Sequence, residues 1–355
     1  MIINSLVELD ENKFPVVIFG SGPAGLSLAL ELEKKNVNCL IIEAGDEYYN
    51  DESQSFYKIN TEGSNLKDIL NSRLRQFGGT SASWGGWCKP LSDLDISKTG
   101  LNPNEIKKYQ SQTCEILGIK NSFKESLINE DFNQIEFQYS DVRFYDKYFS
   151  HIKTSKNIFL LLNTQLSHFE GENQKAEKAI CISNGKFLNI KSSEFILCCG
   201  GIENSRILLW TKFKNKNLLK NNSNIGKYWM THYWILGGIG FVHLDNFKSF
   251  MQNKFLDREG VIHIASNENN KKNKLQSGLY LSTNEDQNFI KEMVKSILCI
   301  APEYGKKIAR LALNKSLKCG NIFMHLEEDP IIENKIILDE NNKDSNQIPL
   351  AKIEY

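Results

Sequence analysis

Two short apolar runs flank an apolar helical pattern near the start of the chain. Val16–Phe19 is a β-branched and aromatic run that ends at glycine, and residues 39–42 form a second apolar run. Between them, leucines and alanines from residue 24 to residue 32 lead into the charged residues 33–35. A strand, a glycine turn, a helix and a strand within about thirty residues predict a βαβ unit with parallel strands.

The next part of the chain is less regular. Residues 45–67 are polar and predict an irregular excursion over the surface, whereas residues 103–118 follow a helical pattern. Residues 157–162 predict a strand. Asn184-Gly185 interrupts an alternating segment and predicts a hairpin. Residues 195–199 predict a buried strand that enters a helix through Gly200-Gly201.

Beyond Trp229 the pattern changes to alternating segments typical of an antiparallel sheet. Residues 288–317 interrupt this region with a helical pattern. The predicted strands cover residues 232–244, 260–266, 277–283, 322–328 and 334–340.

The composition limits the classes of protein to which the chain can belong. The 355 residues carry 43 basic and 43 acidic side chains, so no net charge favours nucleic acid as a partner. The first residues show no export signal, and no apolar run is long enough to span a membrane. None of the eight cysteines forms a CxxC pair, which is typical of reduced thiols in a cytoplasmic protein.

The turn after the first predicted strand has the form GxGxxG, from Gly20 to Gly25. Glycines there permit a tight turn, close approach of a pyrophosphate and close packing of helix on strand, and the helix N-terminus attracts the phosphates. Glu43 follows at the end of the next predicted strand, where a carboxylate can accept both ribose hydroxyls. This spacing predicts a dinucleotide site and disfavours a 2′-phosphate, hence NADP.

A second glycine-rich stretch, residues 73–91, reads RLRQFGGTSASWGGWCKPL. Arg73 and Arg75 precede Gly78–Ser81, whose consecutive N–H groups and hydroxyls predict an anion site. Trp84 and Trp87 lie among glycines, which indicates packing against a flat apolar surface such as a flavin ring.

The order of these motifs resembles the glucose–methanol–choline family of FAD-dependent oxidoreductases. Six segments follow one another in the family's order. They are the first fingerprint with IIEAG, the stretch FGGTSASWGGWCKPL, the segment 92–119, the strand-and-helix motif FILCCGGIENSRILL, the segment NIGKYWMTHYW and the strands after residue 327. The resemblance implies an α/β fold with a Rossmann-like FAD/NAD(P)-binding domain and an inserted α+β substrate domain built on an antiparallel sheet. The FAD-binding domain is expected at residues 13–92 and 155–230, and the substrate domain at residues 93–154 and 231–355. The implied cofactor contacts are Gly20, Ser21, Gly22, Pro23, Ala24, Gly25, Glu43, Ala44, Arg73, Gly78, Gly79, Thr80, Ser81, Ser83, Trp84, Gly85, Gly86, Leu166, Cys199 and Gly200.

Two departures from the family pattern affect the expected chemistry. Ser83 stands where some members carry a histidine bonded to the flavin, so the FAD is expected to be non-covalent. The family's catalytic histidine lies in a later segment and is expected beyond residue 355, so the chain is expected to be incomplete. His232 matches a family position and is expected to be structural, and the remaining histidines, at 151, 168, 243, 263 and 325, are expected to be ordinary.

The implied reaction is oxidation of the CH–OH group of an alcohol, most simply a sugar, by hydride transfer to flavin N5, with an unknown electron acceptor. Two alternatives stay open: a non-catalytic FAD-binding remnant or subunit, and another flavoprotein with two dinucleotide folds. A disulfide reductase of that second kind needs a redox cysteine pair near the first fingerprint, and none is present. It also needs a second GxGxxG, which residues 198–204 do not supply.

Overall fold

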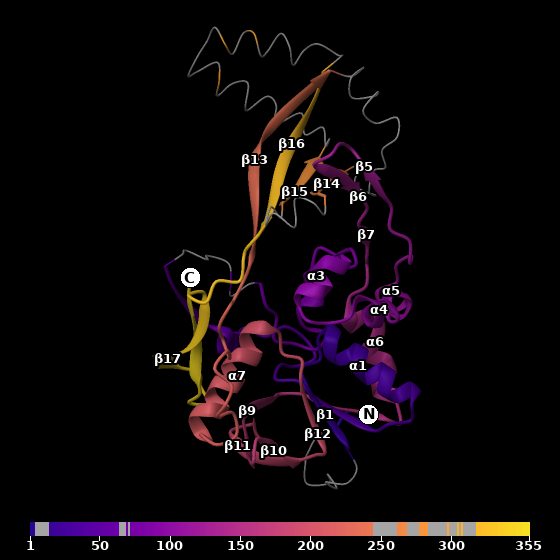
Figure 1. Ribbon diagram of the computed structural model, residues 1–355. Helices are drawn as coiled ribbons and strands as arrows, with labels where there is room; N and C mark the ends of the chain where they lie inside the picture. Colours follow the sequence, from indigo (N-terminus) through magenta and orange to yellow (C-terminus); the bar gives the residue numbers. More distant parts are fainter. Residues whose placement is uncertain are drawn as a thin grey trace. The chain divides into compact units, whose positions relative to one another are not determined.

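A computed structural model describes residues 1–3, 14–63, 69, 72–243, 261–267, 277–282, 297, 304, 307 and 317–355. The chain divides into two compact units. Unit 1 contains residues 1–86, 141–230 and 330–355, and unit 2 contains residues 87–140 and 231–329. Each unit is built from segments that are distant in the sequence (Figure 1).

Unit 1 is built around the predicted parallel sheet. Its strand order is β12-β1-β2-β8, and all pairs are parallel. Helix α1 joins β1 to β2, so the predicted βαβ unit is confirmed. The bounds are β1 Val16–Phe19, α1 Pro23–Lys34, β2 Cys39–Ile42, β8 Ile158–Leu161 and β12 Glu194–Leu197.

Both faces of this sheet are covered, which explains why its strands are continuously apolar. One face belongs to an apolar core cluster that includes Val17, Phe19, Leu40 and Ile42. That cluster continues into an antiparallel sheet of β9 (Thr164–Glu172), β10 (Lys175–Ser183) and β11 (Lys186–Lys191). Helices α1 and α6 (Phe144–Thr154) lie on the other face (Figure 1).

The Asn-Gly hairpin is confirmed. Asn184 and Gly185 join β10 to β11 with φ of 49° and 72°. Positive φ at both central residues is the turn geometry that fits the twist of a hairpin.

A third sheet corrects the prediction that residues 45–67 are irregular. This segment contains α2 (Asp51–Gln54), a 3₁₀ helix η2 (Ser55–Tyr57) and β3 (Ile59–Glu62). Strand β3 pairs in parallel with β18 (Pro349–Glu354), which pairs antiparallel with β17 (Lys335–Lys343). The hydrophobic pattern did not indicate β3, because β3 is a mostly polar strand at the edge of its sheet. Its partner strand, β18, lies near the other end of the sequence.

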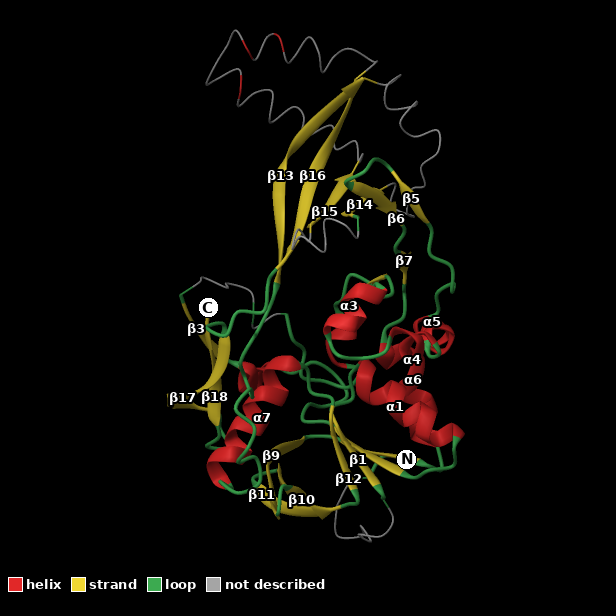
Figure 2. Cartoon of the chain, viewed as in Figure 1, coloured by secondary structure: helices red, strands yellow, loops and turns green. Residues whose placement is uncertain are grey.

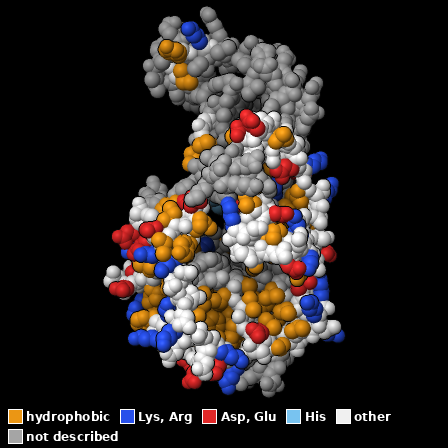
Figure 3. All heavy atoms as spheres, in the orientation of Figure 1, with side chains coloured by type: hydrophobic (Ala, Val, Ile, Leu, Met, Phe, Trp, Pro, Cys, Tyr) orange, Lys and Arg blue, Asp and Glu red, His pale blue; other side chains and the backbone are white. Residues whose placement is uncertain are grey.

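Helix α7 (Gly201–Lys214) contributes Ile202 to a small apolar cluster with Ile336, Ala351 and Ile353 of the third sheet. The predicted passage from a strand through glycine into a helix is therefore confirmed. In Figure 3, basic and acidic side chains are interspersed over the visible face of unit 1, consistent with the balanced charge of the sequence.

Unit 2 contains a six-stranded antiparallel sheet in the order β13-β16-β15-β14-β6-β5 (Figure 2). The predicted strands near residues 232–244, 260–266, 277–283 and 322–328 are all in this sheet. The predicted helix at residues 288–317 falls almost wholly outside the described residues. The bounds are β5 Glu125–Leu127, β6 Phe132–Ile135, β13 His232–His243, β14 Val261–Ser266, β15 Ser277–Ser282 and β16 Leu317–Glu327.

The remaining elements of unit 2 are short. The helical pattern at residues 103–118 forms two helices rather than one, and β4 pairs with β7. Their bounds are β4 Trp87–Cys88, α3 Asp93–Lys98, α4 Pro103–Lys107, α5 Gln110–Leu117 and β7 Gln138–Tyr139.

The first segment of unit 1 ends at residue 86 rather than at the predicted residue 92, and two larger segments also differ from the predicted domains. Helix α6 belongs to unit 1, where Phe149 packs against Phe77 with ring centroids 5.0 Å apart. Strands β17 and β18 also belong to unit 1, because β18 pairs with β3. Both differences arise from contacts between distant segments, which local patterns do not report.

Candidate functional site

The turn between β1 and α1 needs glycine at its two ends. Gly20 has φ +98°, and a Cβ there would lie 2.6 Å from the carbonyl oxygen of Cys198. A Cβ on Gly25 would lie 2.0 Å from the carbonyl oxygen of Gly20. The first glycine therefore permits the turn beside β12, and the last permits the helix to approach it closely.

Gly22 differs from these two glycines. Its backbone is extended, with φ −72° and ψ −175°, and an added Cβ would meet no atom within 4 Å. It is the N-cap of α1, no side chain caps this helix end, and Pro23 occupies the first turn. Open space thus lies in front of a helix N-terminus, whose N–H groups and dipole attract anions.

Glu43 is buried at the end of β2 and is tied to the same turn. Its Oε2 accepts hydrogen bonds from the backbone N–H of Ser21 at 2.9 Å and from the Ser21 hydroxyl at 2.7 Å. Its Oε1 accepts one from the backbone N–H of Gly45 at 2.8 Å. A carboxylate offers about four acceptor positions, so hydrogen bonds from the described residues use three of them and leave one on Oε1. The contact of Glu43 with a ribose stays a prediction, and these hydrogen bonds favour one ribose hydroxyl rather than two.

The second glycine-rich stretch lies directly against the first. The Gly78 N–H donates to the carbonyl of Ser21 at 3.1 Å. A Cβ on Gly79 would lie 3.1 Å from the Cα of Gly22. The two motifs, more than fifty residues apart in the sequence, therefore form one continuous backbone surface.

Hydroxyls in this stretch serve the loop itself. The Ser81 hydroxyl donates to the carbonyl of Gly78 at 2.7 Å, and Oγ of Thr80 accepts from the Leu74 N–H at 3.2 Å. They hold the 3₁₀ helix η3 (Gly79–Ala82), which follows the left-handed Gly78. The contribution of the Ser81 hydroxyl to an anion site stays a prediction.

The later residues of the second glycine-rich stretch lie in two different units. The Trp84 indole N–H donates to the carbonyl of Val142 at 3.1 Å, and an added Cβ on Gly85 would meet nothing within 4 Å. Ser83 is exposed, and Gly86 ends unit 1. Trp87 belongs to unit 2 and packs there.

A third glycine segment joins the first two in unit 1. The Cys198 N–H donates to the carbonyl of Phe19 at 2.7 Å, which holds the end of β12 beside the fingerprint turn. Gly200 has φ +80° and is the N-cap of α7, again without a side-chain cap. Added Cβ atoms on Gly200 or Gly201 would meet nothing within 4 Å. This second helix also begins in open space.

Cys199 is half-buried at the end of β12, next to Gly200. Its thiol donates to the carbonyl of Phe19 at 3.3 Å. Burial raises the pKa of Cys199 well above its ordinary value, and the neighbouring carboxylates of Glu203 and Glu43 raise it further. The thiol therefore stays protonated and packs as an unreactive group.

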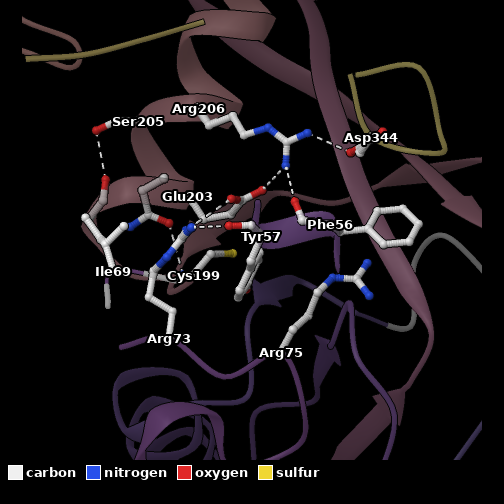
Figure 4. A network of polar contacts seen from close by, with 12 residues as sticks. Phe56, Tyr57, Ile69, Arg73, Arg75, Cys199, Glu203, Ser205, Arg206 and Asp344 are labelled. Atoms are coloured by element: carbon white, nitrogen blue, oxygen red, sulfur yellow. Dashed lines mark hydrogen bonds and ion pairs between the residues drawn. The ribbon is translucent and has the colours of Figure 1, made fainter. Parts of the chain in front are cut away.

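The two arginines before Gly78 face the segment of α2 and η2 (Figure 4). Arg73 donates through Nη2 to the carbonyl of Tyr57 at 2.8 Å and stacks on that ring at 4.6 Å. Its Nη1 lies 3.7 Å from a Glu203 oxygen, and its buried Nε and Nη1 form no hydrogen bond with any residue that the structure describes. Arg75 stacks on Phe56 at 4.5 Å. Arg73 thus carries buried donor capacity, whereas Arg75 packs on Phe56 and donates to the Ser53 hydroxyl.

A buried ion-pair network is centred on Arg206 of α7 (Figure 4). Arg206 on α7 donates to Glu203 at 2.9 Å and to Asp344 at 2.6 Å. It also donates to the carbonyl of Pro349 at 2.6 Å. The network joins α7 to the third sheet, and short sequence patterns gave no signal for it.

Leu166 is the predicted contact that lies apart from these loops. It is 5% exposed on β9 and belongs to the apolar core cluster. Its expected contact with a cofactor stays a prediction.

Unit 2 brings together histidines that the sequence treats as scattered. The ring of His263 lies 4.9 Å from Trp87 and 4.8 Å from Phe137, between centroids. His325 lies 6.4 Å from Trp87. The signal that could have found them is the strand register, which requires knowing which strands pair. In the part of the chain that is described, no group of His, Cys, Asp or Glu is arranged to hold a metal ion.

Comparisons with known proteins agree with the geometry of unit 1. Residues 13–56 match the family model described as an FAD binding domain. Among solved structures, the chain is similar to pyridoxine 4-oxidase from Mesorbium loti, with 11% sequence identity and a TM-score of 0.56 over 96% of this chain and 75% of that chain. No curated protein matches the sequence. Within the described residues, no helix is long and apolar enough to cross a membrane.

The cofactor is FAD, and the chain has the fold of an FAD-dependent oxidoreductase. The residues present fit this group. Two uncapped helix N-termini open at Gly22 and Gly200, where added Cβ atoms would enter empty space, and Glu43 keeps one acceptor position. A phosphate-bearing ligand with a ribose hydroxyl matches this donor and acceptor set.

Proposed function

We propose that this protein is an oxidoreductase of the glucose–methanol–choline type, which oxidises the CH–OH group of an alcohol or sugar. The observation that carries the proposal is the convergence of the two glycine-rich motifs, through the contact of Gly79 with Gly22, in the order along the chain that the family shows. The similar fold of a pyridoxine 4-oxidase adds support, and pyridoxine is itself an alcohol.

The surroundings of the cofactor-binding residues indicate which part of FAD each of them would bind. The N–H groups at the start of α1 would bind the pyrophosphate, together with the backbone of Gly78 and Gly79. The free acceptor position of Glu43 would bind a ribose hydroxyl. Ser83 and Gly85, both exposed beside Trp84, would lie along the ring system. Serine cannot form the histidyl bond to flavin, so the FAD is non-covalent.

FAD supplies a two-electron acceptor for the hydrogen of the substrate carbon. The protein must then hold the cofactor, position the alcohol and accept the hydroxyl proton. Unit 1 provides the first of these through its glycine loops. The six-stranded sheet of unit 2 is the proposed substrate domain.

The test is anaerobic reduction of the FAD-loaded protein by a panel of alcohols. D-glucose, benzyl alcohol and pyridoxine represent sugars, simple aromatic alcohols and the substrate in the name of the similar structure. Bleaching of the oxidised flavin band by at least one alcohol, with formation of the carbonyl product, is expected. A protein that binds FAD, is reduced by dithionite and is bleached by none of a broad alcohol panel would contradict the proposal and favour the non-catalytic reading.

A further inference from the structure

Unit 2 contains a cavity between its short helices. It is lined by residues of β4, α3, α4 and α5 and of the loops that join them (Figure 2), and its volume is about 400 Å³. Ligand pockets in proteins range from about 300 to 1,000 Å³. Every described residue of its wall lies between residues 87 and 123, so the cavity is a feature of unit 2 by itself. We name it the α3–α5 cavity.

The wall of the α3–α5 cavity is largely apolar. Aliphatic side chains from α3, from α5 and from the loop after α5 contribute to it, among them Ile96, Leu117 and Ile119. Two cysteines, Cys88 and Cys114, also line it. Burial raises the pKa of both thiols, so they stay protonated and behave as small apolar groups.

Two polar side chains of the wall form hydrogen bonds within their own segment. The Thr113 hydroxyl donates to the carbonyl of Tyr109 at 2.9 Å. The Gln110 amide donates to the Asn121 side chain at 2.7 Å. A buried polar group without a hydrogen bond is costly, so the part of a ligand that enters this cavity must be apolar.

Apolar side chains of the same wall are also exposed to solvent. Leu91 is 64% exposed, Tyr109 is 60% exposed and Ile106 is 41% exposed. Single exposed apolar residues are common, but a group of them around one cavity is typical of a binding surface. These side chains would lose water contact when an apolar molecule enters.

The charged side chains of the wall are basic. Lys89 is half-buried and Lys107 is about half exposed, and among the described residues no Asp or Glu lines the cavity. Lys107 pairs with Asp93 at 2.7 Å, outside the wall. An exposed pair of this kind contributes little free energy, so Lys107 can also attract an anion that reaches the cavity. An apolar interior with two ammonium groups fits a molecule that has an apolar body and one negative group.

We propose that the α3–α5 cavity binds a medium-chain fatty acid, with its chain inside the cavity and its carboxylate beside Lys89 and Lys107. The volume indicates the chain length. At about 30 Å³ for each heavy atom, the share of one water molecule in the liquid, 400 Å³ holds roughly 13 heavy atoms, and decanoate has about 12. This site is separate from the glycine loops of unit 1 and does not depend on the proposed oxidation.

The first experiment is calorimetric titration of the FAD-loaded protein with hexanoate, octanoate, decanoate and tetradecanoate, each below the concentration at which it forms micelles. Each methylene group that leaves water strengthens binding about fourfold, so affinity should rise about 16-fold for every two carbons. The rise should continue to decanoate and stop before tetradecanoate, because the cavity is then full. Decylammonium has the same chain with the opposite charge and should bind at least about threefold more weakly than decanoate.

The second experiment fills the mouth of the cavity. Thr113 lies on the exposed side of α5 and lines the cavity, whereas Gln112 is exposed on the same helix and does not line it. Thr113→Trp should weaken decanoate binding about 10-fold or more, since excluding two methylene groups alone costs about 16-fold. Gln112→Trp is the matched control and should bind decanoate as wild type does.

A third comparison tests the charge. The double variant Lys89→Gln with Lys107→Gln should weaken decanoate binding about 3- to 20-fold and leave the binding of 1-decanol within about twofold. Lys108→Gln is the control, because Lys108 is exposed beside Lys107 but does not line the cavity.

The outcomes decide the proposal. Failure of decanoate to bind, or binding that Thr113→Trp leaves within about twofold of wild type, would show that the cavity is not the site. Equal binding of decanoate and decylammonium would overturn the choice of a carboxylate. If Thr113→Trp does not fold, as judged by circular dichroism, the chain-length series and the decylammonium comparison in wild type still decide.

Discussion

Replacing Gly22 by alanine tests whether the open space before α1 holds the cofactor. The backbone of Gly22, at φ −72° and ψ −175°, suits any residue, and the added Cβ would meet no protein atom within 4 Å. Alanine is a poorer N-cap than glycine by roughly 1 kcal/mol at most. It also restricts the unfolded chain, which stabilises by about 0.4–1 kcal/mol. The free energy of unfolding of the FAD-free protein should therefore change by less than about 1 kcal/mol.

FAD binding should respond very differently. The new methyl carbon would stand where a pyrophosphate must approach the N–H groups of α1. Hydrogen bonds to a charged group contribute about 1.5–3 kcal/mol each. Loss of one or two of them weakens binding by about 10- to 10⁴-fold. Titration of FAD followed by its fluorescence, with urea unfolding of the FAD-free protein, measures both quantities.

Gly25→Ala is the matched comparison. Its Cβ would lie 2.0 Å from the carbonyl oxygen of Gly20, so backbone must move. This variant should lose about 1–3 kcal/mol of stability or more before any ligand is added. Wild-type affinity for FAD in Gly22→Ala would refute the reasoning, because the pyrophosphate could then not approach this helix end.

Three further predictions follow from buried polar groups. Arg206→Met leaves the buried carboxylate of Asp344 without its cation and leaves Glu203 with Arg73 alone, so urea unfolding should show a loss of about 3–5 kcal/mol. A loss below about 1 kcal/mol would contradict the network. Glu43→Gln replaces an acceptor with an amide facing the Ser21 N–H and hydroxyl. The unfolding free energy of the FAD-free protein should fall by about 1–3 kcal/mol, and FAD affinity should fall as well. Unchanged stability would show that the carboxylate is not held there. Burial alone would raise the pKa of Asp339, but hydrogen bonds from Asn60, Asn342 and the backbone N–H groups of residues 341 and 342 outweigh it and lower the pKa. The ionised Asp339 thus stabilises the protein at pH values above the pKa of the unfolded state, and this stabilisation is lost as the pH falls through the pKa of the folded state. Asp339→Asn should therefore flatten the acid side of a plot of unfolding free energy against pH. An unaltered slope would count against the assignment.

The first fingerprint could be predicted from the sequence because its chemistry is local. Gly20, Gly22 and Gly25 act within one turn, and the apolar runs around them belong to strands buried on both faces. The Asn184-Gly185 hairpin was predictable for the same reason, since two residues determine the turn.

Features that depend on distant pairing could not be predicted. Strand β3 has no apolar run of its own and is defined by its pairing with β18. The placement of His263 opposite Tyr280 and of His325 opposite Gly278 depends on the register of β14, β15 and β16, which no single segment encodes. Spacing also could not show that the hydrogen bonds of Glu43 leave it a single free acceptor position.

The pairing of β3 with β18 also constrains how the protein is made. Glu62 ends β3 and Pro349 begins β18, so 286 residues (63–348) lie between them. At a synthesis rate of about 5–20 residues per second, β3 waits roughly 15–60 s for its partner. During that interval the first fingerprint can fold around its own βαβ unit, while the edge of β3 stays open to other chains. We therefore expect newly made chains to be most prone to aggregation in the interval before β18 can pair with β3.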